Sequence, residues 1–385
     1  MKVRLGIDVG TSMIKVLYGV NDGEQKLEYI ALSPEVMAVD ASLITEMMTI
    51  SGSDFVKPEH QAIIRLGKGL DGFFVGRMAQ EQRVSVAMKP LKTSSLIPKI
   101  LAALGVIAHR LDCWSFSVSL MLLLPLSEDL EATRIVCQLK AIRQFYFRDK
   151  LCKISWTAFC CYPEGLGLLL SERDFEGTLI GFQFGYRNTS LLVLEDGSLN
   201  RSKSSTTLYG FHDCLDKIAY RIPGCDRELL QSAIITSSKM NYDGKQWFNK
   251  SYSHLALREA HMNEYQISIL DEAWSSGLKL YWQLLEQSWL KDRLPSSVER
   301  VVIGGGASVF ISPYLKEYLR SVVPGVMCDL GITLLRLNCL LLKMINGQPN
   351  KISLLDFSIC GSCWSLTEGR VIDNFPQIVE FFDFA

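Results

Sequence analysis

The chain has 385 residues, of which 48% are hydrophobic and 21% are charged, and its formal net charge is −1. A globular protein of this length is expected to contain two or three subdomains, and the near-neutral charge excludes a broadly basic surface for direct DNA binding. The eleven cysteines are irregularly spaced, no stretch resembles a signal peptide, and no apolar run reaches about 18 residues. We therefore expect a cytoplasmic protein with reduced thiols and no transmembrane segment.

The first half of the chain predicts an α/β domain that opens with strands. Residues 2–9, 14–20 and 27–33 are expected to form three consecutive strands, with a polar turn at Asn21-Asp22-Gly23. Residues 35–65 show no clear pattern. The other predicted elements are a helix over 94–110, a buried strand over 115–126, a helix from the N-cap Ser127 to about Tyr146, a strand over 152–161 and a helix over 163–170 with Pro163 in its first turn.

The second half repeats this opening. Strands are predicted over 178–185 and 189–197, with a third near 198–206. The later elements are expected to be helices over 209–221 and 226–237, a long amphipathic helix over 259–291, a strand over 299–306, a helix from Ala307 to Leu319 and a last helix over 330–345. Two halves that each begin with a hairpin bent at a glycine predict a duplicated α/β architecture.

Three glycine-bearing bends each follow a buried strand directly, and they carry the candidate chemistry. Their sequences are DVGTS (8–12), QFGYRNT (183–189) and GGGA (304–307). Glycine lets backbone N–H groups approach a phosphate closely, while Asp8 suits a hydrated Mg²⁺ ion and Lys15 suits phosphate charge. Each bend taken alone is equally typical of an ordinary tight turn, and neither the Walker A nor the G-x-G-x-x-G motif occurs at any of them.

In this order the three bends resemble the phosphate-1, phosphate-2 and adenosine motifs of the actin/Hsp70/sugar-kinase ATPase superfamily. The segment YPEGLG (162–167) resembles the connection between its two domains. The segments CYPEG, GYRNTS and LYGFHDCLDKIAYRI (208–222) are similar to the corresponding segments of bacterial actin-like filament proteins of the ParM type. Over roughly residues 3–346, the resemblance implies an actin-like fold of two duplicated RNase H-like domains with a nucleotide cleft. Domain I would be 1–170, completed by about 331–385, and domain II would be 171–330.

The resemblance also implies a role for each residue at the bends, with Mg²⁺ and ATP, or alternatively GTP, as cofactors. These roles are Asp8 as the metal-side acid, Gly10, Thr11 and Ser12 around the β-phosphate, Lys15 on the phosphates, Glu164 orienting the attacking water, Gly185 and Thr189 bracketing the γ-phosphate, and Gly304, Gly305 and Gly306 beside the adenosine.

The second hairpin departs from the family pattern at two positions. The family usually has Asp where this chain has Gln183, and again where it has Ser190. Glutamine still accepts a hydrogen bond from water but carries no charge and cannot act as a base, and a lost carboxylate of this kind costs about 10²–10³ in rate. With Glu164 and Gln183 as the catalytic candidates, the sequence predicts a weak ATPase whose nucleotide binding is better supported than fast hydrolysis.

The resemblance favours a protein that polymerises with itself and is targeted by a small adaptor. The adaptor would link the filament to DNA for plasmid segregation, or to the membrane as a cortical cell-shape cytoskeleton. A small-molecule kinase of the sugar-kinase type and a non-hydrolysing pseudo-ATPase scaffold stay as alternatives. The aromatic stretch Trp274, Tyr281, Trp282 and Trp289 is either a contact surface or, more commonly, part of the core.

Overall fold

The structure, a computed structural model, describes residues 1–11, 13–20, 27–50, 56–82, 91–169, 175–225, 227, 230, 263–295, 297–323 and 325–330. The described chain falls into two compact units, which we call unit 1 (Met1–Glu164) and unit 2 (from Gly165 onward). Most of the helix predicted over 226–237 lies outside the described residues. So do nearly all of the helix predicted over 330–345 and the segment 331–385 expected to complete domain I.

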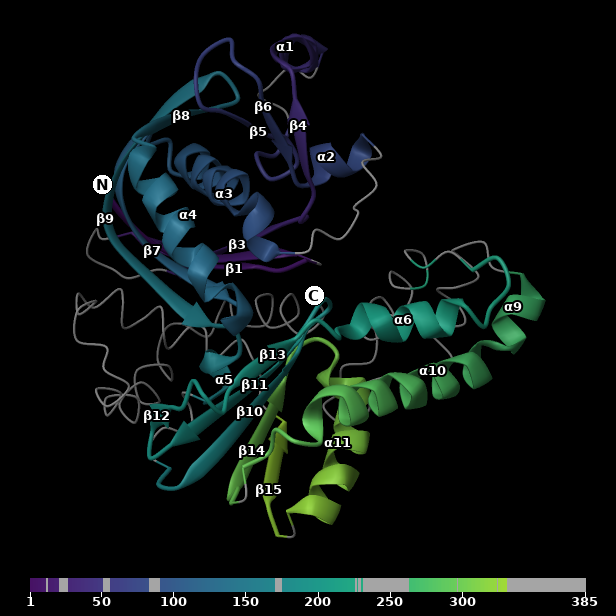
Figure 1. The fold of residues 1–385 in the computed structure, drawn as a ribbon. Helices are drawn as coiled ribbons and strands as arrows, with labels where there is room; N and C mark the ends of the chain where they lie inside the picture. Colours follow the sequence, from purple (N-terminus) through teal and green to yellow (C-terminus); the bar gives the residue numbers. More distant parts are fainter. Residues whose placement is uncertain are drawn as a thin grey trace, which may run out of the picture. The chain divides into compact units, whose positions relative to one another are not determined.

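The described part of unit 1 is built on a nine-stranded mixed sheet (Figure 1). Its strand order is β3-β2-β1-β7-β9-β8-β5-β6-β4. The strands are β1 (Lys2–Val9), β2 (Ile14–Val20), β3 (Leu27–Leu32), β4 (Val36–Val39), β5 (Ala62–Arg65), β6 (Gly72–Val75), β7 (Ser115–Leu124), β8 (Gln144–Phe147) and β9 (Lys150–Pro163). Because β1, β7 and β9 run parallel, their carboxyl ends meet at one edge of the sheet.

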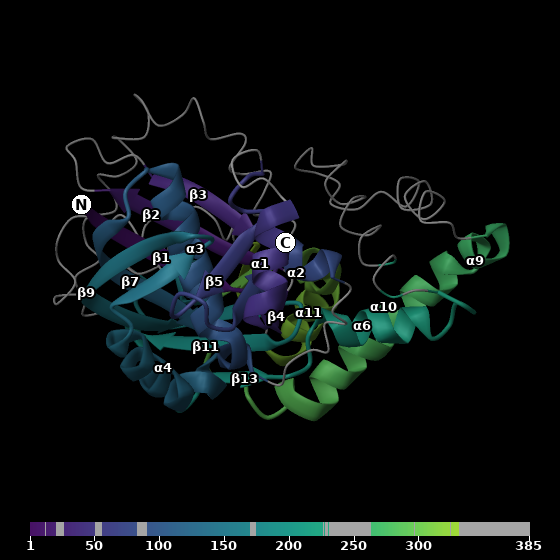
Figure 2. The same ribbon diagram turned by 90° about the horizontal axis from the view of Figure 1, so that it is seen from above.

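Two helices cover one face of this sheet. Helices α3 (Leu96–Arg110) and α4 (Asp129–Ala141) lie side by side against it, as Figures 1 and 2 show. Every second residue of β1, namely Val3, Leu5, Ile7 and Val9, is fully buried in the core they share. The period of two that predicted the strand therefore also decides which face of β1 packs and which face presents Asp8. The shorter helical elements are α1 (Ala41–Ile50), α2 (Arg77–Glu81), η1 (Lys92–Ser95) and η2 (Leu126–Glu128).

Two predictions for this half were wrong. The helix expected from Ser127 to Tyr146 is split, because η2 precedes α4 and α4 already ends at Ala141, which leaves Gln144–Phe147 to pair as β8 between β5 and β9. Pro163 does not open a helix. It ends β9 as the partner of Leu124, and helix α5 (Leu166–Leu169) begins only after Gly165, whose φ is +85°.

The described part of unit 2 contains a six-stranded sheet of order β12-β11-β10-β14-β15, with β13 pairing β11. Its strands are β10 (Thr178–Phe184), β11 (Thr189–Glu195), β12 (Ser198–Leu199), β13 (Ser205–Thr207), β14 (Arg300–Gly304) and β15 (Met327–Leu330). Strands β10, β14 and β15 are parallel. Helices α6 (Phe211–Ala219), α10 (Leu270–Leu285) and α11 (Ser308–Val322) pack on one face (Figure 1), and α5 packs against β10 and β14 on the other.

The long helix predicted over 259–291 is interrupted. Its described part consists of α9 (Glu264–Ser268), capped by Asn263, then α10, then a π-helical turn at Glu286–Leu290 (η4). The core interpretation of its aromatic stretch is confirmed, because Trp274, Tyr281 and Trp282 are at most 7% exposed and pack in one hydrophobic cluster, with Trp289 at its margin.

The last predicted helix was wrong at its start, since Leu330 belongs to β15. Among the described residues, no helix combines the length and the apolar character that a bilayer-spanning segment needs.

Candidate functional site

The bend between β1 and β2 is a tight hairpin in which steric constraints require glycine at position 10. Asp8 pairs with Lys15 and Val9 with Ile14, so that residues 10–13 make the turn. A methyl group on Gly10 would lie 2.4 Å from the carbonyl oxygen of Met13, so no larger residue fits without opening the turn. As cross-strand partners, Asp8 and Lys15 lie on the same face, opposite the core. Thr11 follows Gly10 in this turn, and Ser12 lies outside the described residues.

Acidic side chains gather where the three parallel strands of unit 1 end. Asp8 is near the end of β1, Glu164 directly follows β9, and Glu128 lies just after β7 in η2. The backbone N–H of Glu164 donates to the carbonyl oxygen of Leu124 at 2.9 Å, which ties the end of β9 to the end of β7. The carboxyl ends of parallel strands are where open α/β sheets bind ligands. The sequence predicted Asp8 and Glu164 for this site but did not identify Glu128.

Lys92 is a further residue of this edge that sequence reasoning missed. Its ammonium forms an ion pair with Glu164 and lies 3.9 Å from Oδ1 of Asp8. The backbone N–H groups of Lys92 and Thr93 donate to the carboxylate of Glu128 at 3.0 and 2.9 Å. Lys92 and Glu164 are 72 positions apart and belong to no common motif, so the sequence held no signal that would have joined them.

The donors at this edge fit a hydrated Mg²⁺ ion. Oδ1 of Asp8 is buried and has no hydrogen-bond partner within the described chain, which is the state of a carboxylate oxygen that a bound cation or its water would satisfy. The described residues contain no cluster of three or more His, Cys, Asp or Glu side chains suited to a metal. A magnesium ion held through one carboxylate, water and substrate phosphates matches this donor set better than an all-protein cage.

The carboxylate of Asp8 also affects Tyr29, which lies on β3. Burial and then the nearby carboxylate of Asp8 raise the pKa of its phenol, so the side chain stays neutral at physiological pH. Its hydroxyl lies 3.8 Å from the sulfur of Met13 in the first hairpin. The hairpin is therefore backed by an uncharged aromatic side chain.

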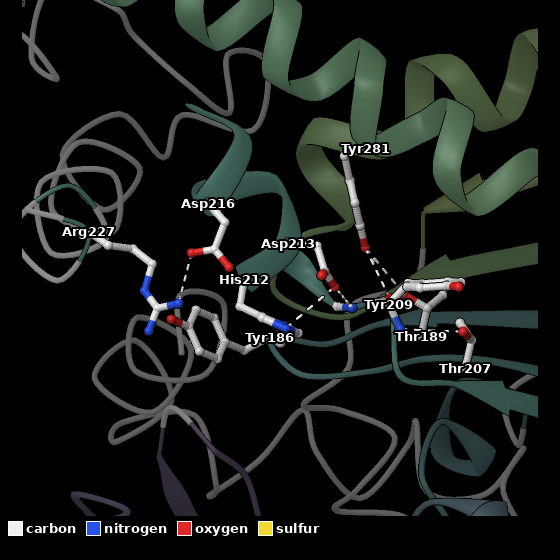
Figure 3. Close-up of polar contacts among 10 residues, drawn as sticks. Tyr186, Thr189, Thr207, Tyr209, His212, Asp213, Asp216, Arg227 and Tyr281 are labelled. Atoms are coloured by element: carbon white, nitrogen blue, oxygen red, sulfur yellow. Dashed lines mark hydrogen bonds and ion pairs between the residues drawn. The ribbon is translucent and has the colours of Figure 1, made fainter. Parts of the chain in front are cut away.

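The second bend, between β10 and β11, is joined to helix α6 (Figure 3). The hairpin closes through the N–H of Gly185 and the carbonyl oxygen of Asn188 at 2.9 Å. The first N–H groups of α6, from Phe211 and His212, donate to the carbonyl oxygens of Gly185 and Tyr186. Gly210 makes this possible, because a methyl group there would lie 2.2 Å from the backbone of Arg187. The hairpin and the start of α6 thus form one hydrogen-bonded body.

Thr189 has a structural contact of its own in this body. Its hydroxyl donates to the carbonyl oxygen of Tyr209 at 2.8 Å and lies 3.4 Å from the hydroxyl of Tyr281 (Figure 3). The residue is fully buried. Ser190, at the position where the family that the sequence resembles usually has Asp, lies 2.9 Å from the hydroxyl of Thr206. The expected phosphate role of Gly185 and Thr189 stays a prediction. In this conformation the hydroxyl of Thr189 is bonded to the backbone carbonyl of Tyr209.

The third bend contacts the second. Gly305 has a φ of +96°, and a methyl group on it would lie 2.3 Å from the carbonyl oxygen of Phe184. The N–H of Ala307 donates to that same oxygen at 3.2 Å. Gly304 is in register with Gln183, and Gly306 is exposed before α11. The two glycine bends of unit 2 are therefore neighbours at the carboxyl ends of β10 and β14.

Gln183 lies on the sheet face that α5 covers. Its Cβ would be 2.9 Å from a methyl group on Gly165, the residue that follows Glu164. Its amide oxygen Oε1 is buried and has no hydrogen-bond partner among the described residues. Glutamine at this position thus offers an acceptor for water, as the sequence suggested, but it brings no charge to the site.

No protein-family model matches the sequence, and no curated protein matches it. Several solved structures, however, are similar to this chain. Alp7A, an actin-like protein, superposes with a TM-score of 0.57 at 14% identity, covering 90% of this chain and 99% of that chain. ParM of Bacillus thuringiensis with ATP gives 0.56 at 17% identity, covering 90% and 100%, and apo ParM of pSK41 gives 0.51 at 11% identity, covering 87% and 94%.

These similarities show that the chain has the actin-like fold of bacterial ParM and Alp7A. The predicted fold is therefore confirmed as a mixed α/β structure with two sheets and actin-like topology.

Proposed function

We propose that this chain, whose fold is that of bacterial ParM, binds Mg-ATP and polymerises into filaments in a nucleotide-dependent way. The observation that carries the proposal is the convergence of Asp8, Lys92 and Glu164 at the carboxyl ends of β1 and β9, beside a hairpin that only glycine can close. The ParM structure from Bacillus thuringiensis was obtained with ATP, which supports ATP as the nucleotide. GTP is the alternative.

The proposed binding roles follow the chemistry of the bends. Asp8 would hold Mg²⁺ through water, and the ion would neutralise phosphate charge. Lys15 would add a point charge. The remaining contacts would come from backbone groups and hydroxyls, around the β-phosphate from Gly10, Thr11 and Ser12, around the γ-phosphate from Gly185 and Thr189, and beside the adenosine from Gly304, Gly305 and Gly306.

We propose slow hydrolysis. Glu164 would orient the attacking water, because it is the buried carboxylate adjoining Asp8 at the strand ends. Gln183 accepts hydrogen bonds but cannot take a proton, and Ser190 bonds to Thr206 instead of supplying an acid. With the carboxylates of this hairpin missing, turnover about 10²–10³ below that of a fully acidic site is expected. A filament with such subunits would be long-lived.

The partner of each subunit would be another copy of the chain, and a small adaptor would attach the filament to its cargo. That cargo would be either a plasmid or the cell envelope. The chain is near-neutral overall, so attachment to DNA would pass through the adaptor rather than through the filament itself.

The test is pelleting and negative-stain imaging of the purified protein with ATP, with ADP, with a non-hydrolysable analogue and with no nucleotide, while released phosphate is measured in parallel. Filaments that need nucleotide, together with slow phosphate release, are the expected result. Filaments without phosphate release would identify a pseudo-ATPase scaffold, a reading that Gln183 and Ser190 favour. Absence of polymer under every condition would contradict the proposal and favour a small-molecule kinase or a monomeric ATPase.

A further inference from the structure

We propose that Lys92 is a positioning residue for hydrolysis, which holds the carboxylate of Glu164 in place and balances the charge of Asp8. The inference deepens the proposed function and rests on it. Lys92 belongs to none of the three glycine bends, and it reaches the site from η1, the short 3₁₀ helix before α3.

The backbone of Lys92 is held in place by contacts of its own, separate from those of its side chain. The carboxylate of Glu128 accepts two hydrogen bonds, from the N–H groups of Lys92 and Thr93, and the residue is only 1% exposed. Two charge-assisted bonds to one carboxylate hold the start of η1 in a single orientation. Glu128 itself follows β7, so the position of Lys92 is set by the same strand ends that carry Asp8 and Glu164.

The side chain of Lys92 is buried together with that of Glu164, and Asp8 beside them is partly exposed. It is 6% exposed and that of Glu164 is 8% exposed, while that of Asp8 is 24% exposed. Two carboxylates brought together in a partly desolvated site repel each other, and an ammonium group in contact with one and 3.9 Å from the other offsets that repulsion. The ammonium therefore lies where it contacts one carboxylate and is close to the other.

Stability alone does not account for a buried lysine here. A buried ion pair generally contributes no more to stability than well-packed apolar residues of similar volume. What the pair does provide is a single direction for the Glu164 carboxylate, and a group that orients water acts only when it is held within a narrow geometry. The arrangement is therefore suited to the hydrolytic step.

The experiment measures kcat for phosphate release and Kd for Mg-ATP in four variants beside the parent protein. Lys92→Met is expected to lower kcat by about 10–100-fold while Kd stays within about threefold, and Lys92→Arg is expected to restore part of the lost rate. Lys99→Met removes another buried lysine, seven residues further along the chain in α3, and controls for the loss of a buried cation with kcat expected to be unchanged.

The decisive comparison is between Glu164→Gln and the double variant Lys92→Met/Glu164→Gln. If Lys92 acts through Glu164, adding Lys92→Met to Glu164→Gln leaves kcat unchanged, because the group that it positions has already been lost. A further drop of tenfold or more would show an independent role and overturn the inference. The double variant removes both members of the buried Lys92–Glu164 pair and leaves only the partly exposed Asp8 without its cation, so this comparison holds even if Lys92→Met alone fails to fold.

The other outcomes separate this inference from the proposed function. Unchanged kcat in Lys92→Met, with Mg-ATP bound and hydrolysed by the parent protein, overturns the role of Lys92 alone. A large loss of affinity in Lys92→Met would put the ammonium on the phosphates and also overturn the positioning role. A parent protein that does not bind Mg-ATP overturns the proposed function and this inference together, and one that binds without hydrolysis leaves no step for Lys92 to serve and overturns the inference only.

Discussion

Asp8 is the residue on which the proposed nucleotide site depends most directly. It lies at the end of β1 with a buried Oδ1 that lacks a hydrogen-bond partner among the described residues. We expect Asp8→Ala to weaken Mg-ATP binding by about 10–100-fold, the range for a lost bond to a charged group, and to abolish nucleotide-dependent assembly. Equilibrium binding with a fluorescent ATP analogue and a pelleting assay measure the two effects. Normal assembly by this variant would remove Asp8 from the metal site.

Gln183 offers the converse experiment, in which a carboxylate is added. Its amide oxygen is buried and lacks a described hydrogen-bond partner, and it packs against Gly165. We expect Gln183→Asp to raise the rate of phosphate release by about tenfold or more, since a negative charge here would position metal or water more strongly. Gln183→Asn, which has the shape of aspartate without its charge, serves as the control. An equal rate in both variants would place the metal elsewhere.

At the same scale, the sequence predicted the ends of strands well and isolated side chains poorly. Asp8 and Gly10 were recognisable because a hairpin glycine follows a buried strand in a fixed local pattern. Lys92 was not recognisable, since only the tertiary fold brings it to Glu164 from 72 positions away. Glu128 directly follows the predicted N-cap Ser127, and local spacing did not show that its carboxylate accepts hydrogen bonds from η1. Charged groups that meet through topology leave no trace in local spacing.

At the scale of elements, period and turn chemistry predicted the long strands and helices, and tertiary pairing decided the rest. β1, β2 and α3 begin and end close to their predicted limits, and each is a long apolar segment of which most residues are buried. Short strands such as β8 were missed, since their four residues pair only within the assembled sheet. The π-helical turn at η4 likewise has no period of its own to detect.

The contact between the two glycine bends of unit 2 leads to a stability prediction. Gly305 combines a φ of +96° with a backbone oxygen 2.3 Å from the place of a methyl group. Gly325 has a similar φ of +88°, but no atom of the described residues lies within 4 Å of the place of its methyl group. We expect Gly305→Ala to destabilise the protein by about 2–4 kcal/mol, from backbone strain and displacement of Phe184. Gly325→Ala carries only the backbone part, about 1 kcal/mol.

Urea unfolding monitored by circular dichroism compares the two glycine variants. Equal losses of free energy of unfolding would mean that the neighbouring strand end yields at no cost, and that the two bends are not rigidly joined. A larger loss in Gly305→Ala supports a fixed arrangement of the β10 and β14 ends.

At the scale of the whole molecule, hydrolysis and polymer lifetime are expected to be linked through Glu164. We expect Glu164→Gln to keep Mg-ATP binding, to lower phosphate release by about 10²–10³, and to give filaments that persist after free ATP is removed. Glutamine keeps the size of the side chain while removing the charge. Light scattering after apyrase addition measures the decay of polymer. Turnover equal to that of the parent protein would show that Glu164 does not orient the water.

The hydrogen bonds between the second hairpin and α6 also bear on the intrinsic fluorescence of the protein, through Trp274. The ring of Trp274 lies 6.5 Å from that of Phe211, whose N–H is bonded to Gly185, and 5.1 Å from that of Phe310, whose N–H is bonded to Ala307 of the third bend. This indole therefore packs on two rings whose backbones are bonded to the two glycine bends of unit 2. We expect nucleotide to change the intrinsic tryptophan emission, and Trp274→Phe to remove most of that change, so that occupancy can be followed in real time without any label.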